Sequence, residues 1–284
     1  MPKAKQSNTL PIAPIPSENK PKDKRIAKMK YGPTLPKLPV TSVILGRVGS
    51  GKSSCLYSLL TQGFVYGKSK RSVFDEMVFY VGNKESVPAL EKIKCKNKCI
   101  LHEFEEDHFS EYLENLKAHQ LERLEKNKAP MNVAVIFDDM AGVALLKRKK
   151  GANQNALERL LLTSRHEANC SVFFLSQVYK SGGFTTPLCR NNVMNWIIYN
   201  MSRPEMEKIA EDHSQQYTPQ EFLAMYDKAM EKPYNFITID YRRPLNERIW
   251  ERFDKPIEYT ITDTPYDAKA NESESSSSSD SDSD

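Results

Sequence analysis

The stretch Gly46–Ser53 has the residue types and spacing of a phosphate-binding loop, G-x-x-x-x-G-K-S. Its glycines allow tight turns that point backbone N–H groups at phosphate oxygens, and a helix starting near Lys52 would add its positive N-terminal end. Lys52 is expected to reach the β- and γ-phosphates of a nucleoside triphosphate, and Ser53 to bind its Mg²⁺ ion. The residues expected to contact the nucleotide are Gly46, Arg47, Val48, Gly49, Ser50, Gly51, Lys52, Ser53 and Ser54.

The carboxylate pair Asp138 and Asp139 ends the apolar run 132–137. At a strand tip, Asp138 is placed to hold Mg²⁺ directly or through water, and Asp139 to orient and polarise an attacking water. A turn that caps the following segment is the alternative for such a pair, but the phosphate-binding loop upstream favours the metal site. The two motifs together predict ATP hydrolysis.

Polar residues later in the chain are candidates for sensing and neutralising charge. Gln177 follows the apolar run 170–176, where an amide can detect a γ-phosphate by hydrogen bonding; a solvent-facing strand end is the alternative. Arg190 is the preferred arginine finger and Arg165 the alternative one, each equally well explained as a surface arginine.

Four consecutive cations predict either a loop that binds DNA phosphates or a solvated basic turn. They are Lys147, Arg148, Lys149 and Lys150.

Strand and helix patterns alternate along the chain and supply the elements that these residues need. Strand patterns rich in Val, Ile, Phe and Tyr occupy residues 41–45, 76–81, 99–104, 132–137, 170–176, 195–200 and 235–240. Helical patterns occupy residues 52–62, 85–93, 106–128, 154–168, 204–213 and 218–231. Largely apolar strands are typical of a parallel sheet buried on both faces, and the alternation predicts a doubly wound α/β domain.

Two of these elements allow further predictions, one about the order of strands in the sheet and one about helix packing. The strand at 76–81 falls between the two motif strands in sequence, which fits a RecA-like arrangement with an additional strand between them. Small-molecule kinases have those two strands adjacent. The helix at 106–128 should pack on the outside of the sheet through one apolar stripe, which consists of Phe109, Tyr112, Leu113, Leu116, Leu121 and Leu124.

Composition divides the chain into a central domain and two charged ends. Residues 1–38 are rich in proline and carry nine Lys and Arg against two acids, whereas residues 261–284 end in an acidic serine run. Both ends are expected to be disordered because they have too few apolar side chains to offset their ordering entropy, which leaves an ATPase domain at 39–260.

Five cysteines without a signal peptide indicate free thiols in a reducing compartment. No apolar run approaches membrane-spanning length, so no membrane partner is expected.

With these motifs in place, the chain resembles the poxvirus-type genome-packaging ATPases of large double-stranded DNA viruses. That family belongs to the FtsK–HerA superfamily and has relatives in virophages and polinton-like elements. The resemblance covers roughly residues 40–242 and depends on the segments GRVGSGKSS, VAVIFDDM, TSRHEANCSVFFLSQVY and CRNNVMNWIIY. It implies Lys52 and Ser53 for ATP and Mg²⁺, Asp138 and Asp139 for metal and water activation, and Gln177 as the sensor. Asp139 departs from the glutamate of many FtsK–HerA motors.

The expected fold is therefore an α/β P-loop NTPase with a RecA-like, additional-strand, mostly parallel sheet flanked by helices. The resemblance implies ATP-driven translocation of double-stranded DNA into a capsid by a homo-oligomeric ring, with a capsid or portal-vertex protein as a further partner. It implies a location in the host cytoplasm or nucleus at the site of assembly, or in the virion. The alternatives are another nucleic-acid motor, such as a helicase or a DNA-transfer ATPase of a mobile element, and a non-enzymatic nucleotide-binding interaction protein.

Overall fold

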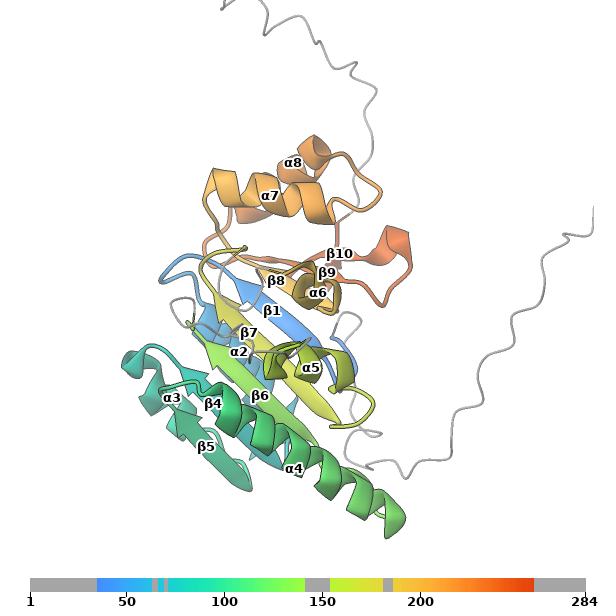
Figure 1. The fold of residues 1–284 in the computed structure, drawn as a ribbon. Helices are drawn as coiled ribbons and strands as arrows, with labels where there is room; N and C mark the ends of the chain where they lie inside the picture. The colour runs from blue at the N-terminus through green and yellow to red at the C-terminus, as the bar shows by residue number, and fades with distance from the viewer. Residues whose placement is uncertain (1–34, 63–65, 69–70, 141–153, 181–185, 258–284) are drawn as a thin grey trace, which may run out of the picture.

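A large, mostly parallel sheet dominates the computed structural model, which describes residues 35–62, 66–68, 71–140, 154–180 and 186–257 (Figure 1). Within that part of the chain, nine strands pair in the order β11-β10-β9-β8-β1-β7-β6-β4-β5. They are β1 (Thr41–Leu45), β4 (Glu76–Val81), β5 (Asn97–Leu101), β6 (Val133–Asp138), β7 (Cys170–Ser176), β8 (Asn195–Ile198), β9 (Ile237–Asp240), β10 (Ile249–Glu251) and β11 (Lys255–Pro256). The short strands β2 (Gly67–Lys68) and β3 (Arg71–Ser72) form a separate pair. The predicted α/β fold class is confirmed.

The lateral order of the strands places the two motifs on nearby strands. β1, which leads into the phosphate-binding loop, lies between β7 and β8 and is parallel to both. β6, which ends in Asp138, pairs with β7 on one side and with β4 on the other. One strand therefore separates the two motif strands, as predicted, but that strand is β7 and not residues 76–81. After β1 the chain crosses over two strand positions before it forms β4, a choice that the strand patterns do not encode.

The outer edge of β8 carries an antiparallel extension. β9 pairs with β8, β10 with β9, and β11 with β10, each in the antiparallel sense. The strand expected at 235–240 is thus correctly identified as a strand but does not belong to the parallel part of the sheet. The β10–β11 hairpin and the five-residue helix α6 (Pro187–Asn191) have no counterpart among the predicted elements.

Helices cover both faces of the sheet. They are α2 (Lys52–Thr61), α3 (Val87–Glu91), α4 (Glu106–Glu125), α5 (Ala156–Thr163), α6, α7 (Arg203–His213) and α8 (Pro219–Met230), with 3₁₀ turns η1 (Lys84–Ser86) and η3 (Leu245–Glu247). Buried side chains of α2 and α3 belong to one hydrophobic cluster, and those of α4 to α8 belong to the cluster on the opposite face. This two-sided packing is the doubly wound arrangement expected from the alternating patterns.

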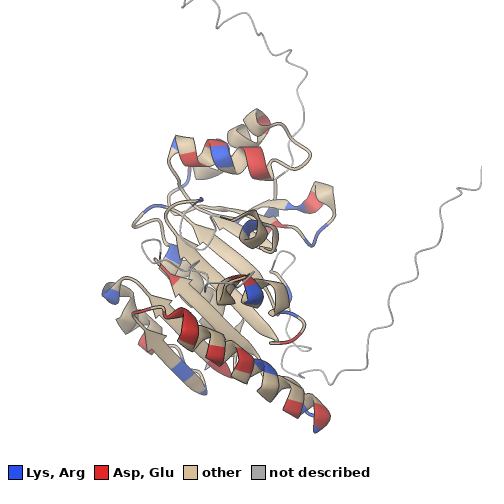
Figure 2. Ribbon diagram, viewed as in Figure 1, with Lys and Arg blue, Asp and Glu red and all other residues tan. Residues whose placement is uncertain are grey.

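Helix α4 packs on the sheet with one change from the expected stripe. Phe109, Leu113 and Leu116 are buried, but Leu121 is 59% exposed, so its assignment to the stripe was wrong. Gln120 is buried instead: its Nε2 donates to the carbonyls of Met131 (2.8 Å) and Ala168 (2.7 Å), and its Oε1 accepts from Met131 N (2.9 Å). A fully bonded amide can be buried without the usual penalty. Charged side chains line the rest of α4 (Figure 2).

The predicted ends lie largely outside the described residues: all of 261–284, and 1–38 except its last four residues. Among those four, Leu35 is buried and Pro36 O accepts a hydrogen bond from the Tyr66 hydroxyl at 2.6 Å. The last four residues of the predicted arm therefore contact the domain. None of the helices in the described ranges is long and apolar enough to cross a membrane.

Candidate nucleotide site

The phosphate-binding loop connects β1 to α2 at the carboxyl edge of the parallel strands. Gly49 and Gly51 have φ values of 76° and 103°, in the left-handed region that favours glycine. The N–H groups of Gly46 and Arg47 donate to Ser176 O (3.2 Å) and Asn200 O (3.1 Å), which fix the loop to its neighbours. Gly51, the N-cap residue of α2, has no side chain to bond the first-turn N–H groups, which suits this positive helix end to binding an anion.

Lys52 lies folded against this loop. Its Nζ donates to Gly46 O at 2.7 Å and to Arg47 O at 2.9 Å. Partial burial lowers the pKa of the Lys52 ammonium, and the charges of Asp139 and Asp138 oppose that shift. The lysine is therefore within electrostatic range of both carboxylates, although it precedes them by more than eighty residues in the sequence.

Asp138, the last residue of β6, is only 3% exposed. Burial raises the pKa of its carboxyl group; Asp139 adds to that shift, whereas a hydrogen bond from Ser86 and the charge of Lys52 oppose it. Its Oδ2 is buried and has no hydrogen-bond partner among the described residues. Hard divalent cations bind carboxylate oxygens, so this orphaned oxygen fits a Mg²⁺ ligand.

Asp139 is held in an uncommon backbone conformation. Its φ is 54°, which is strained for a residue with a side chain and is often associated with function. Gln177 Nε2 donates to Asp139 Oδ1 at 3.0 Å. Gly82, just after β4, packs so closely that a Cβ there would lie 2.2 Å from Asp139 O. The backbone and the carboxylate of Asp139 are thus both positioned by neighbours.

The end of β7 contacts both halves of the site. Leu175 O accepts from Asp139 N, and the next carbonyl, Ser176 O, accepts from Gly46 N, each at 3.2 Å. The Ser176 hydroxyl donates to Val178 O at 2.8 Å and closes a local turn. Of the two polar residues at this strand tip, Gln177 is therefore the one that reaches the carboxylates.

The two arginine candidates lie toward the opposite edge of the parallel strands. Arg190 is on α6, which precedes β8, and Arg165 lies shortly before β7 (Figure 1). Both line one cavity of about 480 Å³. Arg190 Nε is 3.7 Å from Asp212 Oδ2, and its guanidinium carbon is 6.0 Å from the centre of the Tyr179 ring. The structure thus gathers Lys52, the two aspartates and Gln177, but not the arginines, around the chain's own loop.

Comparison with known proteins decides the family. Residues 29–240 match the family described as poxvirus A32 protein. The chain belongs to that family. Among solved structures, this A32-family chain is similar to the DNA-packaging ATPase B204 from Sulfolobus turreted icosahedral virus, with a TM-score of 0.53 and 16% sequence identity over 78% of this chain and 99% of that chain. It is also similar to B204 from Sulfolobus turreted icosahedral virus 2 in complex with AMPPCP, at 18% identity and a TM-score of 0.49, over 77% and 98% of the two chains. No curated protein sequence matches the chain.

The family match confirms the poxvirus-type resemblance that the sequence motifs indicated, and B204 shares the fold of this A32-family chain. Two of its neighbours at the acids were missed from the sequence: Gly82, which contacts Asp139, and Ser86, which bonds Asp138. A signal for Gly82 existed, because a glycine directly after an apolar strand marks a close approach at the sheet edge. The predicted DNA-contact residues Lys147, Arg148, Lys149 and Lys150 lie outside the described residues.

Proposed function

We propose that this chain binds Mg²⁺-ATP at Gly46–Ser54 and uses its hydrolysis to move double-stranded DNA into a capsid. The observation that carries the proposal is the convergence of Lys52, Asp138 and the hydrogen-bonded pair Asp139–Gln177 at one edge of the sheet. A lysine, two acids and an amide around an uncapped helix start provide charge neutralisation and water positioning for phosphoryl transfer. B204, described as a DNA-packaging ATPase, shares the fold and supports this assignment.

Two residues are assigned to the metal. Asp138, with its orphaned Oδ2, and Ser53, exposed in the first turn of α2, are the proposed ligands. When bound, Mg²⁺ neutralises charge on the β- and γ-phosphate oxygens. Lys52 leaves the carbonyls of Gly46 and Arg47 to contact the same phosphates, because a phosphate oxygen is a stronger acceptor for an ammonium than a neutral carbonyl.

Asp139 and Gln177 are assigned to the attacking water and to the γ-phosphate. Oδ1 of Asp139 is bonded to Gln177, so the carboxylate has its other oxygen to accept a proton from a water. The Gln177 amide lies at the tip of the strand between the two motifs, where it can exchange its bond to Asp139 for one to the γ-phosphate. Loss of that phosphate would return the amide to Asp139 and change the position of the β7 tip.

The remaining assignments concern assembly. Arg190, or alternatively Arg165, is proposed to enter the nucleotide site of a neighbouring subunit in a homo-oligomeric ring, because both lie toward the edge opposite the chain's own loop. Lys147, Arg148, Lys149 and Lys150 are proposed to contact DNA phosphates without reading sequence. A capsid or portal-vertex protein is the proposed docking partner, at the site of assembly in host cytoplasm or nucleus or in the virion.

The test is the ATPase rate of the full chain with and without duplex DNA, for wild type, Lys52→Ala and Asp139→Asn. Duplex DNA should raise the ATPase rate of the wild-type chain, and the duplex should not be unwound. Lys52→Ala should lose ATP binding, whereas Asp139→Asn should keep ATP binding and lose hydrolysis on the order of 100-fold. Asn tolerates left-handed backbone as Asp does, so the fold should be retained. A rate indifferent to DNA, or strand separation, would contradict the packaging assignment.

A further inference from the structure

The loop between α8 and β9 presents an aromatic ring to solvent beside the phosphate-binding loop. Tyr234 is 70% exposed, and among the Phe, Tyr and Trp side chains of the described ranges it is the one that is exposed. A Cβ built on Gly51 would lie 3.9 Å from Tyr234 Cδ1 and 3.7 Å from Tyr199 Cε1. Tyr234 therefore lies at the start of α2, although nothing in its local sequence connects it with that helix.

The sheet order shows which end of a nucleotide this ring faces. The strands that carry Asp138 and Gln177, β6 and β7, lie on one side of β1. The strands next to Tyr199 and Tyr234, β8 and β9, lie on the other side. A triphosphate whose γ-phosphate lies beside the acids has its sugar and base at its far end, and the β8–β9 side is where that end must extend.

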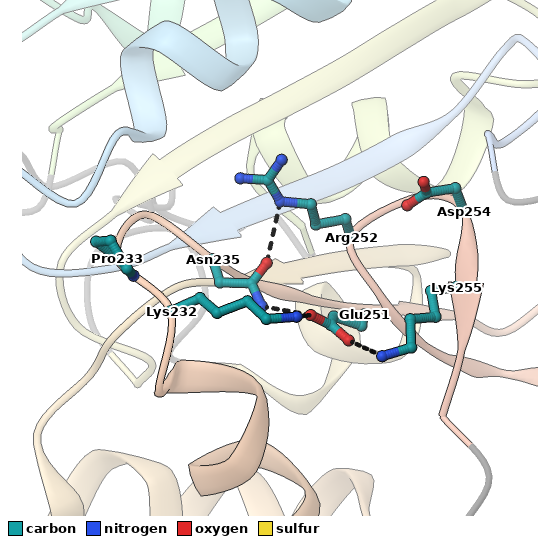
Figure 3. Close-up of a pocket in the computed structure, with 7 residues that line it drawn as sticks. All are labelled: Lys232, Pro233, Asn235, Glu251, Arg252, Asp254 and Lys255. Atoms are coloured by element: carbon teal, nitrogen blue, oxygen red, sulfur yellow. Dashed lines mark hydrogen bonds and ion pairs between the residues drawn. The ribbon is translucent and has the colours of Figure 1, made fainter.

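Hydrogen bonds of the neighbouring residue Asn235 hold the loop that carries Tyr234 in place. The backbone of Tyr234 has φ of 56° and that of Arg252 has φ of 55°, both strained for residues with large side chains. Buried Asn235 joins the two: its Nδ2 donates to Ala229 O (2.7 Å) and Glu251 Oε1 (2.9 Å), and its Oδ1 accepts from Arg252 Nε (3.0 Å) (Figure 3). The strain at Tyr234 is therefore maintained by a bonded network.

Positive charge reaches the same region from Arg252. Its charge lowers the pKa of the Cys55 thiol and the Tyr199 phenol against the larger effect of burial, which places the guanidinium within electrostatic range of the first turn of α2. Figure 3 shows the guanidinium pointing away from Glu251. An exposed ring on strained backbone, at a helix start that also lies within the range of a cation, is an arrangement suited to a ligand that is flat at one end and anionic at the other.

We propose that Tyr234 stacks on the nucleobase of the bound nucleoside triphosphate. The inference rests on the proposed function, because it takes the phosphate-binding loop as the site of the triphosphate. Stacking on an aromatic face is tolerant of base identity, since every base has a π-face. Tyr234 thus contributes to nucleotide affinity through the base and takes no part in the reaction at the γ-phosphate.

The test measures the dissociation constants of Mg²⁺-ATP and of inorganic tripolyphosphate, a base-free probe, for the full chain. Tyr234→Ala should raise the Kd for ATP about 10-fold, whereas Tyr234→Phe should stay close to wild type. Tripolyphosphate affinity should be the same in all variants. The matched control is Leu245→Ala, since Leu245 is also exposed but lies on η3, beyond the opposite end of β9.

The binding results distinguish failure of the Tyr234 stacking role from failure of the proposed function. If Tyr234→Ala binds ATP as wild type does, or loses tripolyphosphate affinity to the same extent as ATP affinity, the stacking role is overturned and the proposed function stands. If wild type binds neither ATP nor tripolyphosphate, the proposed function fails and the stacking role fails with it.

Discussion

Gln177 donates a hydrogen bond from Nε2 to Oδ1 of Asp139 at 3.0 Å. The residue assigned to sensing the γ-phosphate and the residue assigned to activating water are therefore in direct contact. They come from different strand ends, β7 and β6, which are adjacent in the sheet. A change in the bonding of one side chain must alter the position or the proton affinity of the other.

Replacing Gln177 with Ala should lower kcat roughly 10-fold or more while leaving the Kd for ATP nearly unchanged, because the variant removes an interaction that positions the base and not the phosphates. Steady-state kinetics and equilibrium nucleotide binding on the same preparation would measure both quantities. Gln216→Ala, at an exposed glutamine on another surface, is the matched control. Equal loss of affinity and rate would show that Gln177 mainly supports the loop.

Subunit mixing should reveal whether Arg190 acts on a neighbour. Arg190→Ala alone should lose activity on the order of 10³-fold, the usual contribution of an arginine finger. Combined with Lys52→Ala subunits, it should recover activity that neither variant has alone, because some junctions then pair an intact Lys52 with an intact Arg190.

Arg165→Ala, mixed in the same way, is the control for this experiment. Recovery with Arg165→Ala but not with Arg190→Ala would transfer the role to Arg165. Mixed rings that form but stay inactive with both variants would exclude action in trans.

His213 should make stability depend on pH. It is buried between the hydroxyls of Tyr179, at 2.8 Å from Nε2, and Tyr241, and burial lowers its pKa from 6.5 to about 4. Since the unfolded chain binds the proton more tightly than the folded one, stability is lost as pH falls through the window from 6.5 to about 4. The loss at the end of that window should be about 3 kcal/mol.

Chemical denaturation at a series of pH values would measure this dependence. His213→Gln keeps groups that can bond both hydroxyls but does not titrate, so its unfolding free energy should change less between pH 6.5 and about pH 5, above the range where most carboxylates titrate. Parallel curves for the two proteins would show that His213 is not the group responsible.

Much of the fold and the core of the site could be predicted because local pattern is sufficient there. The strands expected at 41–45, 76–81 and 170–176 have those bounds in the structure. Their apolar residues are buried on both faces, and a pattern of that kind leaves little ambiguity. Motif residues placed at the ends of parallel strands must meet at one edge of the sheet, so the proximity of Lys52, Asp138 and Gln177 followed from topology.

What could not be predicted depends on tertiary contacts. The place of β7 between the motif strands is a matter of lateral order, which residue patterns do not specify. Gln120 replaces Leu121 in the α4 interface because three hydrogen bonds, two donated to Met131 O and Ala168 O and one accepted from Met131 N, satisfy its amide. Tyr234 lies in no recognisable motif, and its position beside Gly51 depends on the pairing of β9 with the sheet. The roles assigned to Arg190, Arg165 and the basic run 147–150 stay predictions.

The adjacent carbonyls of Leu175 and Ser176 have a consequence for how this family can change over evolutionary time. One carbonyl binds the backbone of Asp139 and the next binds that of Gly46, so two consecutive residues at the end of β7 set the spacing between the two motifs. A single-residue insertion or deletion within β7 would either disturb that spacing or turn the buried side chains before it to the opposite face. Length differences among related chains should therefore occur in the connections on either side of β7 and not within it.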